Sequence, residues 1–421
     1  MQYVIIGAGS RGMTYGQWAT EHGIKIAAIA ELRPDRLKAA GLQFGVPEQM
    51  QFSDAAQLFA LGKIADAAII ATMDQDHYDH VMQALDCGYD ILLEKPISPD
   101  PAECLQIEAK ANTLGKKITV CHVLRYTDFF QSIKSIIDSG EIGKVVAIKH
   151  AENIGNFHMA HSFVRGNWRN DKLSSPIILQ KSCHDLDILL WLLGKHCLRV
   201  AAFGSLSYFR EENAPEGSTA RCLDCPVAKN CRFDAWQAYQ PILGQWPADV
   251  VCLEPTENAL MKALQTGPYG RCVYRCDNNV CDHMSILMEF DDGITATFSL
   301  TAQSSNIHRN IHIMCEHGEI HGDELDGAIK VTHFRRNSVD PETSRVIQTM
   351  KYDSGHGGGD SGIMEDFTAG LMNKDPDSRS SISRSVESHL MACAIEQARI
   401  TGTVIDMKAY QAALQKRRGD L

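Results

Sequence analysis

The sequence has no long hydrophobic run. None of its 421 residues belongs to an uninterrupted apolar stretch of the roughly 18 residues that a membrane-spanning helix needs. The opening MQYVIIGAGSRG lacks a basic start and meets glycines early, unlike a secretory signal. We therefore expect a cytoplasmic protein that makes no membrane contact.

Positive charge is scarce as well. The 41 Lys and Arg residues face 52 Asp and Glu residues, which gives a net charge of −11. Such a chain repels phosphate backbones, so we do not expect nucleic acid as a partner. Repeats and low-complexity tracts are also missing, and hydrophobic residues make up 44% of the chain. This composition excludes a disordered or collagenous protein and suits a globular one of two domains.

Short apolar runs alternate with helical patterns over the first part of the chain. The runs cover residues 3–7, 24–30, 66–71, 89–93 and 117–120, and helices are expected at 11–22, 34–42, 77–88 and 101–115. Strands that read as continuous apolar runs are buried on both faces, as in parallel sheets. The pattern predicts an α/β fold that begins with a doubly wound, Rossmann-type domain in residues 1–122.

The pattern changes after residue 122. Residues 144–153, 285–290, 294–302 and 310–315 alternate between polar and apolar side chains, and helices are expected at 182–193 and 385–401. This predicts an α+β domain in residues 123–421, with a large, open and mostly antiparallel sheet. Residues 205–282 hold half of the 14 cysteines and many prolines, which indicates an irregular insertion.

A glycine-rich loop follows the first predicted strand and opens the first predicted helix. It fits the pattern G-x-G-x-x-G with Gly7, Ala8, Gly9, Ser10, Arg11 and Gly12. Such a loop lets a pyrophosphate approach the backbone and the helix N-terminus. Glu31 ends the second strand, where an acid binds both ribose hydroxyls and repels a 2′-phosphate. The cofactor is expected to be NAD rather than NADP, although Arg33 could contact either the adenine or a 2′-phosphate.

Two further segments carry a resemblance to a known family. Thr72 and His77 follow the third recognised strand, and Glu94-Lys95-Pro96 follows the fourth. With the glycine loop, these residues resemble the glucose–fructose oxidoreductase / inositol dehydrogenase / MocA (Gfo/Idh/MocA) family of sugar oxidoreductases. The resemblance implies a Rossmann domain, an open-sheet domain that often makes the contact in a homodimer or homotetramer, and hydride transfer between a sugar and the cofactor.

The resemblance also implies roles for single residues. Lys95 is expected near the nicotinamide and the substrate hydroxyl, with Glu94 beside the ribose. Thr72, His77 and His122 are expected to line the cofactor pocket. Contacts with the substrate are expected from Arg125, Trp168, Arg169, Asp187 and His356.

The second catalytic motif departs from the family pattern. The sequence Gln180-Lys181-Ser182-Cys183-His184 has glutamine where the family usually carries an acid, four residues before the histidine. Glutamine cannot titrate, so no acid–histidine pair can form between these positions. His184 remains the expected general acid or base, and Lys181 is expected to supply charge or relay a proton in place of the acid. Which of Lys95 and His184 is the base stays open.

The cysteines of the insertion have a spacing typical of metal ligands. Cys222, Cys225 and Cys231 lie close together in the sequence, and Cys272 and Cys276 compete for a fourth position. Four thiolates can hold a structural Zn²⁺ tetrahedrally. An iron–sulfur cluster and unliganded thiols are the alternatives.

Three functions agree with these residues. The first is an NAD-dependent oxidoreductase that acts on a secondary hydroxyl of a sugar, sugar derivative or glycoside. The second is a glycoside-cleaving enzyme that oxidises, eliminates and reduces again with retained NAD. The third is a dinucleotide-sensing regulator without catalysis, against which the presence of both Lys95 and His184 argues.

Overall fold

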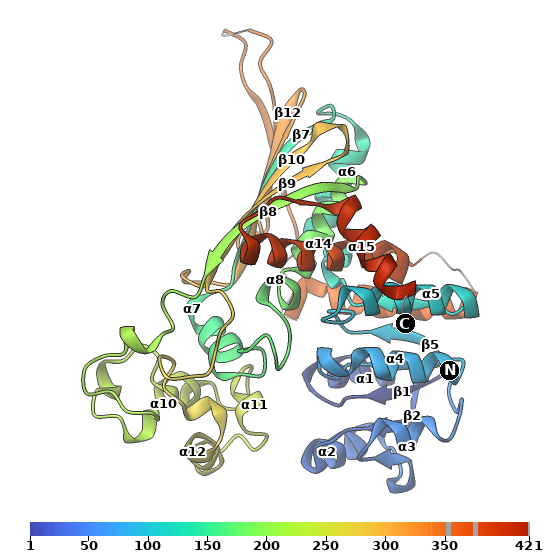
Figure 1. The fold of residues 1–421 in the computed structure, drawn as a ribbon, viewed down its shortest axis with the longest axis vertical. Coiled ribbons are helices and arrows are strands. Elements are labelled where there is room, and N and C mark those ends of the chain that lie inside the picture. Colours follow the sequence, from blue (N-terminus) through green and yellow to red (C-terminus); the bar gives the residue numbers. More distant parts are fainter. Residues whose placement is uncertain (338, 351–354, 374–377, 420–421) are drawn as a thin grey trace.

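The N-terminal sheet is parallel throughout. The computed structural model describes residues 1–337, 339–350, 355–373 and 378–419 (Figure 1). The sheet has the order β3-β2-β1-β4-β5-β6, which is the doubly wound arrangement of dinucleotide-binding domains. Its strands are β1 (Gln2–Ile6), β2 (Lys25–Ala30), β3 (Gln51–Phe52), β4 (Ala67–Ile70), β5 (Asp90–Leu93) and β6 (Ile118–Val120).

Helices separate these strands as the alternation predicts. They are α1 (Ser10–Glu21), α2 (Pro34–Phe44), α3 (Ala55–Phe59), α4 (His77–Asp86) and α5 (Pro101–Leu114). The predicted Rossmann-type fold is confirmed. The sequence reading missed β3 and α3, because a two-residue strand and a single-turn helix give no periodic pattern.

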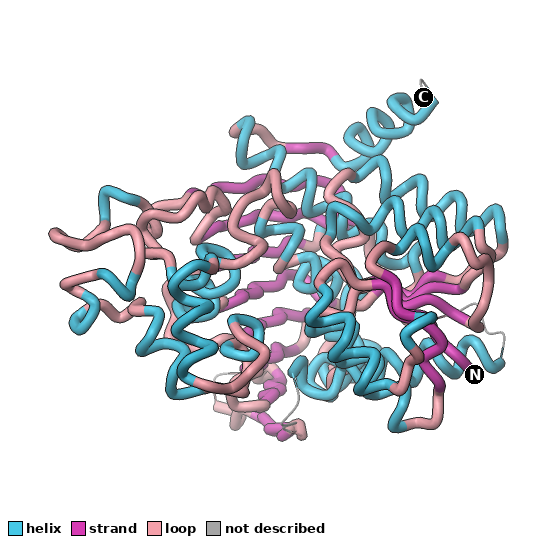
Figure 2. The backbone as a smooth tube through the Cα atoms, turned by 90° about the horizontal axis from the view of Figure 1, so that it is seen from below, coloured by secondary structure: helices cyan, strands magenta, loops and turns pink. Residues whose placement is uncertain are grey.

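The second sheet is mixed and mostly antiparallel, as predicted. Its order is β14-β13-β12-β11-β7-β10-β9-β8-β15, and β7 pairs with β10 in parallel. The strands are β7 (Val145–Asn153), β8 (Cys197–Ser205), β9 (His283–Phe290), β10 (Thr295–Thr301), β11 (His308–Cys315), β12 (Gly318–Asp323), β13 (Ala328–His333), β14 (Thr343–Gln348) and β15 (Ile405–Asp406). Figure 2 shows the two sheets as separate sets of strands.

Helices cover only one face of this second sheet (Figure 1). They are α6 (Asp128–Ser139), α9 (Cys183–Leu193), α14 (Ile382–Thr401) and α15 (Met407–Gly419). Along β9, buried and exposed residues alternate strictly. The uncovered face presents large apolar side chains, among them Phe203 (74% exposed), Leu287 (57%) and Val346 (62%). Among the described residues, no helix combines the length and apolar character needed to cross a bilayer.

The insertion forms an irregular lobe beside the two sheets, at the lower left of Figure 1. Its helices are short: α10 (Ala235–Tyr239), α11 (Ala248–Val251) and α12 (Glu257–Thr266). They pack around a small apolar core of their own, made by Cys222, Ala235, Tyr239, Ala248, Leu260 and Leu264. The insertion lies against the π-helix Met159–Arg165. Other residues of it, among them Phe209, Phe233 and Tyr274, belong to the main apolar core, so only part of the insertion packs on its own.

A late segment of the chain returns to the Rossmann domain. Helix α13 (Gly359–Asn373) packs against α1, and its Phe367 ring lies 5.8 Å from that of Tyr3 in β1. The Tyr3 hydroxyl and Thr368 Oγ1 are 2.9 Å apart. Residues of the second predicted domain thus complete the core of the first, and they bring the preceding loop close to the glycine-rich turn.

Candidate active site

The glycine-rich loop has the backbone geometry that close approach of a ligand requires. Gly7 has a φ of +90°, and a Cβ at this position would lie 2.6 Å from the Ala71 carbonyl oxygen. A Cβ on Gly12 would lie 2.0 Å from the Gly7 oxygen. No other residue type fits at either position. Helix α1 begins directly after this turn, so its first unpaired amides face the space above the loop.

Glu31 follows β2 and contacts the backbone of this loop. One carboxylate oxygen accepts a hydrogen bond from the Ala8 amide at 2.8 Å, and the other accepts one from the Arg33 amide at 2.9 Å. The Arg33 side chain pairs with Asp35 at 2.6 Å, and this hydrogen bond lowers the pKa of Asp35. Because the Arg33 guanidinium is paired with Asp35, it does not neutralise the charge of Glu31.

A cavity of about 1430 Å³ runs from the glycine loop to the second sheet. The predicted residues that line it are Gly7, Gly9, Ser10, Arg11, Glu31, Arg33, Thr72, Glu94, Lys95, Trp168, Lys181, His184 and His356. The insertion contributes Trp246, Val250 and Tyr269 to the wall. The volume exceeds the roughly 300–1,000 Å³ of a typical small-molecule pocket, so it can hold a cofactor and a second molecule together.

The Glu94-Lys95-Pro96 turn is fixed by hydrogen bonds on both sides. Glu94 is buried and accepts from Arg11 Nε at 2.8 Å and from the Tyr15 hydroxyl at 2.6 Å. Burial would raise the pKa of Glu94, but Arg11 and Lys95 lower it overall. The Lys95–Pro96 peptide is cis. The Lys95 ammonium donates to the Gln180 carbonyl at 3.0 Å, which directs it into the cavity.

His184 lies in the first turn of α9, facing the same space. Its Nδ1 is buried and has no hydrogen-bond partner among the described residues. Burial, followed by the nearby charge of Lys95, holds the pKa of His184 well below its usual range. The ring centroid of His356 is 6.0 Å away. His184 is therefore a neutral imidazole at neutral pH, able to accept a proton.

Lys181 has an acidic partner that does not come from its own helix. Its ammonium lies 3.1 Å from Glu152, a fully buried residue of β7. The second oxygen of Glu152 lies 2.6 Å from Arg309 of β11, which also binds Asp185 at 2.8 Å. Burial raises the pKa of Glu152, against the attraction of Arg309 and Lys181. Two cations thus face the cavity, backed by two buried carboxylates.

The segment before α13 connects the cavity to the glycine loop. His356 adopts a φ of +57°, and its Nδ1 lies 3.3 Å from Asp360. Asp360 accepts two hydrogen bonds from Arg11, at 2.5 and 3.0 Å. His356 therefore reaches the cavity as predicted, held by an ion pair between the two domains.

Four predicted cofactor residues are not part of the cavity lining: Ala8 and Gly12, which belong to the glycine-rich loop itself, and His77 and His122. His77 is fully buried, and its ring nitrogens lie 2.7 Å from the Pro96 carbonyl oxygen and 3.2 Å from that of Thr72. It braces the two turns that do line the cavity. His122 is also fully buried, and neither of its ring nitrogens has a hydrogen-bond partner among the described residues. Its ring stands edge-on to His184 with centroids 5.8 Å apart, so it acts behind that side chain.

Three predicted substrate residues form ion pairs away from the cavity. Arg125 and Asp187 form a buried two-bonded pair, at 2.6 and 2.7 Å. A buried charge needs such a partner. The pair joins the segment after β6 to α9, and neither residue lines the cavity. Arg169 pairs with the exposed Asp277 of the insertion at 2.7 Å. Among the substrate residues predicted, only Trp168 and His356 line the cavity.

The predicted thiol set is not assembled for a metal. Cys222, Cys225, Cys231 and Cys272 line a small cavity of about 20 Å³, yet in the described chain no three of their sulfurs lie within 4.8 Å of one another. The buried guanidinium of Arg165 lies beside them, 3.3 Å from Cys222 Sγ, and donates to the Phe233 and Arg271 carbonyls.

Burial raises the pKa of the Cys222 thiol, and it raises the pKa of Cys276 to about 11. All fourteen cysteines are unpaired. Sulfurs this far apart give no support to the zinc and iron–sulfur interpretations.

Several residues of the cavity wall escaped the sequence reading. His158, Trp246, Tyr269 and Arg309 line it, and Asp74 anchors one edge through Ser174 Oγ and Ser175 Oγ at 2.8 and 2.6 Å. Burial lowers the pKa of His158 well below its usual range. Arg309 comes from β11, Trp246 and Tyr269 from the insertion, His158 from the short helix after β7, and Asp74 from the turn after β4. No local motif marks them.

Comparison with known proteins agrees with this geometry. Residues 1–122 match the family described as "Oxidoreductase family, NAD-binding Rossmann fold", and residues 134–407 match its "C-terminal alpha/beta domain". The chain belongs to the Gfo/Idh/MocA family. The predicted resemblance is therefore confirmed, and this family member is an NAD-dependent oxidoreductase.

Individual relatives are distant. A Bacillus subtilis (strain 168) protein, YteT, is 26% identical over 78% of this chain and 77% of its own. An inositol 2-dehydrogenase of Leifsonia xyli subsp. xyli is 28% identical over 50% of this chain, and the alignment spans 58% of that enzyme. The crystal structure of an Agrobacterium radiobacter oxidoreductase with NAD⁺, L-tartaric acid and magnesium has a TM-score of 0.69 at 18% identity, over 97% of this chain and 99% of that one. That similarity establishes the shared fold.

Proposed function

We propose that this family member transfers a hydride between a secondary alcohol carbon of a sugar or sugar derivative and NAD. One observation carries the proposal: Lys95, Lys181 and His184, from different segments, reach the same cavity as the glycine loop. A cation beside a proton acceptor is what the oxidation of an alcohol needs. The inositol 2-dehydrogenase relative supports a polyhydroxylated ring as the substrate class.

The cofactor preference rests on Glu31. The tight turn requires glycine at position 7, because a Cβ there would collide with the Ala71 carbonyl. A turn of this kind, followed by the N-terminus of α1, suits a pyrophosphate. The Glu31 carboxylate lies at the end of β2, where it can accept hydrogen bonds from ribose hydroxyls and repel a 2′-phosphate. We therefore propose NAD rather than NADP. When bound, the nicotinamide supplies the hydride acceptor.

The proton is handled by Lys95 and His184. The Lys95 ammonium keeps N–H groups free beside its bond to the Gln180 carbonyl, and these can bind the substrate oxygen. Positive charge there stabilises an oxygen that develops negative charge. His184 is held neutral, so it can take the hydroxyl proton, and its lowered pKa lets it return that proton readily.

Lys181 takes the place of the missing acid as a fixed cation. Glu152 lies 3.1 Å from its ammonium on the core side and so holds that group at the edge of the cavity. In this arrangement Lys181 orients a substrate hydroxyl by hydrogen bonding. The proton itself moves between the substrate and His184.

Purified full-length protein, NAD⁺ and a panel of inositols, sugars and glycosides provide the test. We expect NADH to accumulate with at least one polyol, and this turnover to be lost in Lys95→Ala and His184→Asn while NADH binding persists. His196→Gln, an exposed histidine outside the cavity, is the matched control. Glycoside cleavage without net NADH would support the redox-hydrolase alternative. NADH binding without any turnover would support the sensor and contradict our proposal.

The expected homodimer or homotetramer is part of the same proposal. The uncovered face of the second sheet, with Phe203, Leu287 and Val346 exposed, supports a second copy of the chain as its partner. Light scattering of the purified protein tests this. A monomer at micromolar concentration would contradict it, and Leu287→Lys should dissociate the assembly if this face is used.

A further inference from the structure

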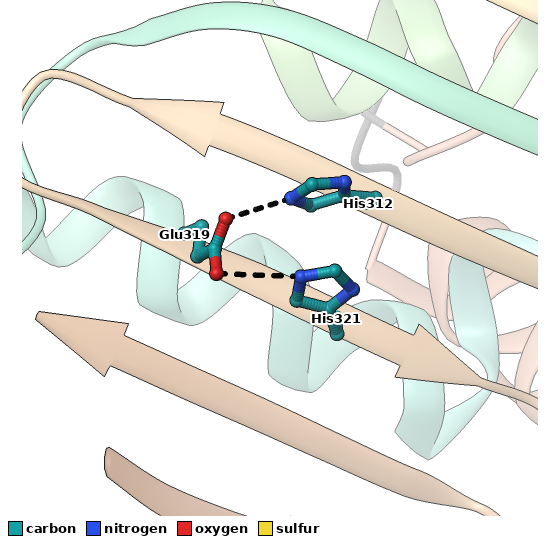
Figure 3. A group of neighbouring side chains, drawn as sticks. All are labelled: His312, Glu319 and His321. Atoms are coloured by element: carbon teal, nitrogen blue, oxygen red, sulfur yellow. Dashed lines mark hydrogen bonds and ion pairs between the residues drawn. The ribbon is translucent and has the colours of Figure 1, made fainter. Parts of the chain in front are cut away.

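Two histidines and a glutamate gather on the uncovered face of the second sheet, away from the catalytic cavity (Figure 3). His312 of β11 and His321 of β12 are directly opposed in the antiparallel register. Glu319 precedes His321 by two positions, so the pleat places both on the same face. The imidazole rings stack, with centroids 3.7 Å apart and planes inclined by 21°.

The three side chains converge on one point. His312 Nε2 lies 2.9 Å from one Glu319 oxygen, and His321 Nε2 lies 3.4 Å from the other. All three ligand atoms fall within 4.8 Å of one another. Figure 3 shows the carboxylate between the two ring nitrogens. The triad needs only a small side-chain movement to point two nitrogens and an oxygen at a shared centre.

This donor set has a chemical preference. Two imidazoles and one carboxylate are ligands for Zn²⁺ and neighbouring transition metals, and Mg²⁺ prefers oxygen ligands alone. The paired strands hold the His312 and His321 backbones at a fixed spacing. Half of the His321 side chain is exposed in the single chain, so an ion and water ligands can reach the site there. If a second copy covers this face, the triad lies at the contact between the two chains.

The surroundings limit the affinity. Lys149 lies directly opposite His312 on β7, and Lys330 lies directly opposite His321 on β13. Both lysines add positive charge, and Glu342 lies 3.8 Å from Lys330 and offsets part of it. Glu319 also supplies negative charge within the triad. Binding is therefore expected to be weaker than at a buried site with four protein ligands.

We propose that His312, Glu319 and His321 form a surface site for a divalent transition-metal ion, with Zn²⁺ as the preferred probe. The ion is coordinated by both Nε2 atoms and a Glu319 oxygen, and water completes its shell. It joins β11 to β12 and thereby stabilises this part of the open sheet. The proposal does not depend on the substrate or on catalysis.

Isothermal titration of the full-length protein with ZnCl₂ tests this site, with MgCl₂ as the comparison ion. We expect saturable binding of Zn²⁺ with one ion per chain at this site, loss of that binding in the double variant His312→Gln/His321→Gln, and weakening in Glu319→Gln. His196→Gln is the matched control, because it removes an exposed histidine that faces a single carboxylate. Circular dichroism of each variant checks that the sheet is intact.

The cysteines of the insertion are the competing ligands, and Co²⁺ separates the two sites. A histidine and carboxylate site gives a Co²⁺ spectrum without sulfur-to-metal charge transfer. Zn²⁺ binding that is unchanged in the folded double variant, or a Co²⁺ spectrum dominated by such charge transfer, would overturn the proposal. Light scattering at each Zn²⁺ concentration distinguishes an ion bound within one chain from an ion that links two chains.

Discussion

Protonation of His389 offers a quantitative test of the packing behind the Glu94-Lys95-Pro96 turn. This side chain of α14 is fully buried. Its Nε2 accepts a hydrogen bond from the Ile97 amide at 2.9 Å, and its Nδ1 lies 3.0 Å from the Ser385 carbonyl. Both nitrogens are satisfied only in the neutral ring. Burial, with His122 as the next cause, lowers the pKa of His389 to about 3.

The expected effect on stability follows from linkage. The unfolded chain has a histidine pKa of about 6.5, so it binds the proton before the folded protein does. The stability that His389 contributes is therefore present above pH 6.5 and is lost as the pH falls. Between about pH 7.5 and pH 5 the loss is about 2 kcal/mol, because each unit below 6.5 costs about 1.4 kcal/mol.

Urea unfolding at these two pH values measures the effect. His389→Leu, which has no acceptor and does not titrate, should be less stable than the wild type at pH 7.5 by about 1–3 kcal/mol, since the Ile97 amide loses its partner. The gap between the two proteins should shrink by about 2 kcal/mol at pH 5. His196→Gln is the control of opposite sign, because its hydrogen bond to Glu387 raises the pKa of His196. A gap that is the same at both pH values would refute the reasoning.

Other predictions concern the cavity. Glu31→Ala should raise the affinity for NADP roughly tenfold or more, because repulsion between the Glu31 carboxylate and the 2′-phosphate is removed. Fluorescence titration with NADPH measures this affinity. An unchanged value would contradict the proposed preference for NAD. Glu152→Gln should raise the KM for the substrate severalfold, because Lys181 loses the carboxylate that holds its ammonium at the cavity. Steady-state kinetics measure this, and Glu152→Asp, which keeps the charge, should stay closer to the wild-type KM. Lys95→Met should raise the pKa of His184, read from ring ¹⁵N shifts, and a fall would show that Lys95 is not the nearby cation.

Much of the fold could be predicted from local patterns. Five of the six Rossmann strands are buried on both faces and read as apolar runs. Gly7 and Gly12 belong to a recognisable glycine pattern that predicts the turn between β1 and α1. Strands β12, β13 and β14 were missed because they are short and rich in charged, polar or small residues. Their pairing partners, not their own sequence, make them strands.

The candidate site was only partly accessible to such reasoning. The sequence reading detected that position 180 lacks an acid, but not that Glu152 lies beside Lys181, because the pair forms between β7 and the segment before α9. In the same way, the thiol spacing suggested a metal, whereas the structure places the Arg165 guanidinium beside the sulfurs. Sequence spacing does not show whether sulfurs from two distant segments come close enough in space to share one ion.

Arg11 connects three segments of the candidate site, although the pattern G-x-G-x-x-G allows any residue at its position. It belongs to the phosphate-binding loop, and its guanidinium binds Glu94, which shapes the Lys95 turn, at 2.8 Å. The same group binds Asp360, in the first turn of α13, at 2.5 Å. His356 lies 3.3 Å from that carboxylate and faces His184 across the cavity. We therefore expect a ligand that displaces or orders Arg11 to act both on the Lys95 turn and on the segment that brings His356 to the cavity.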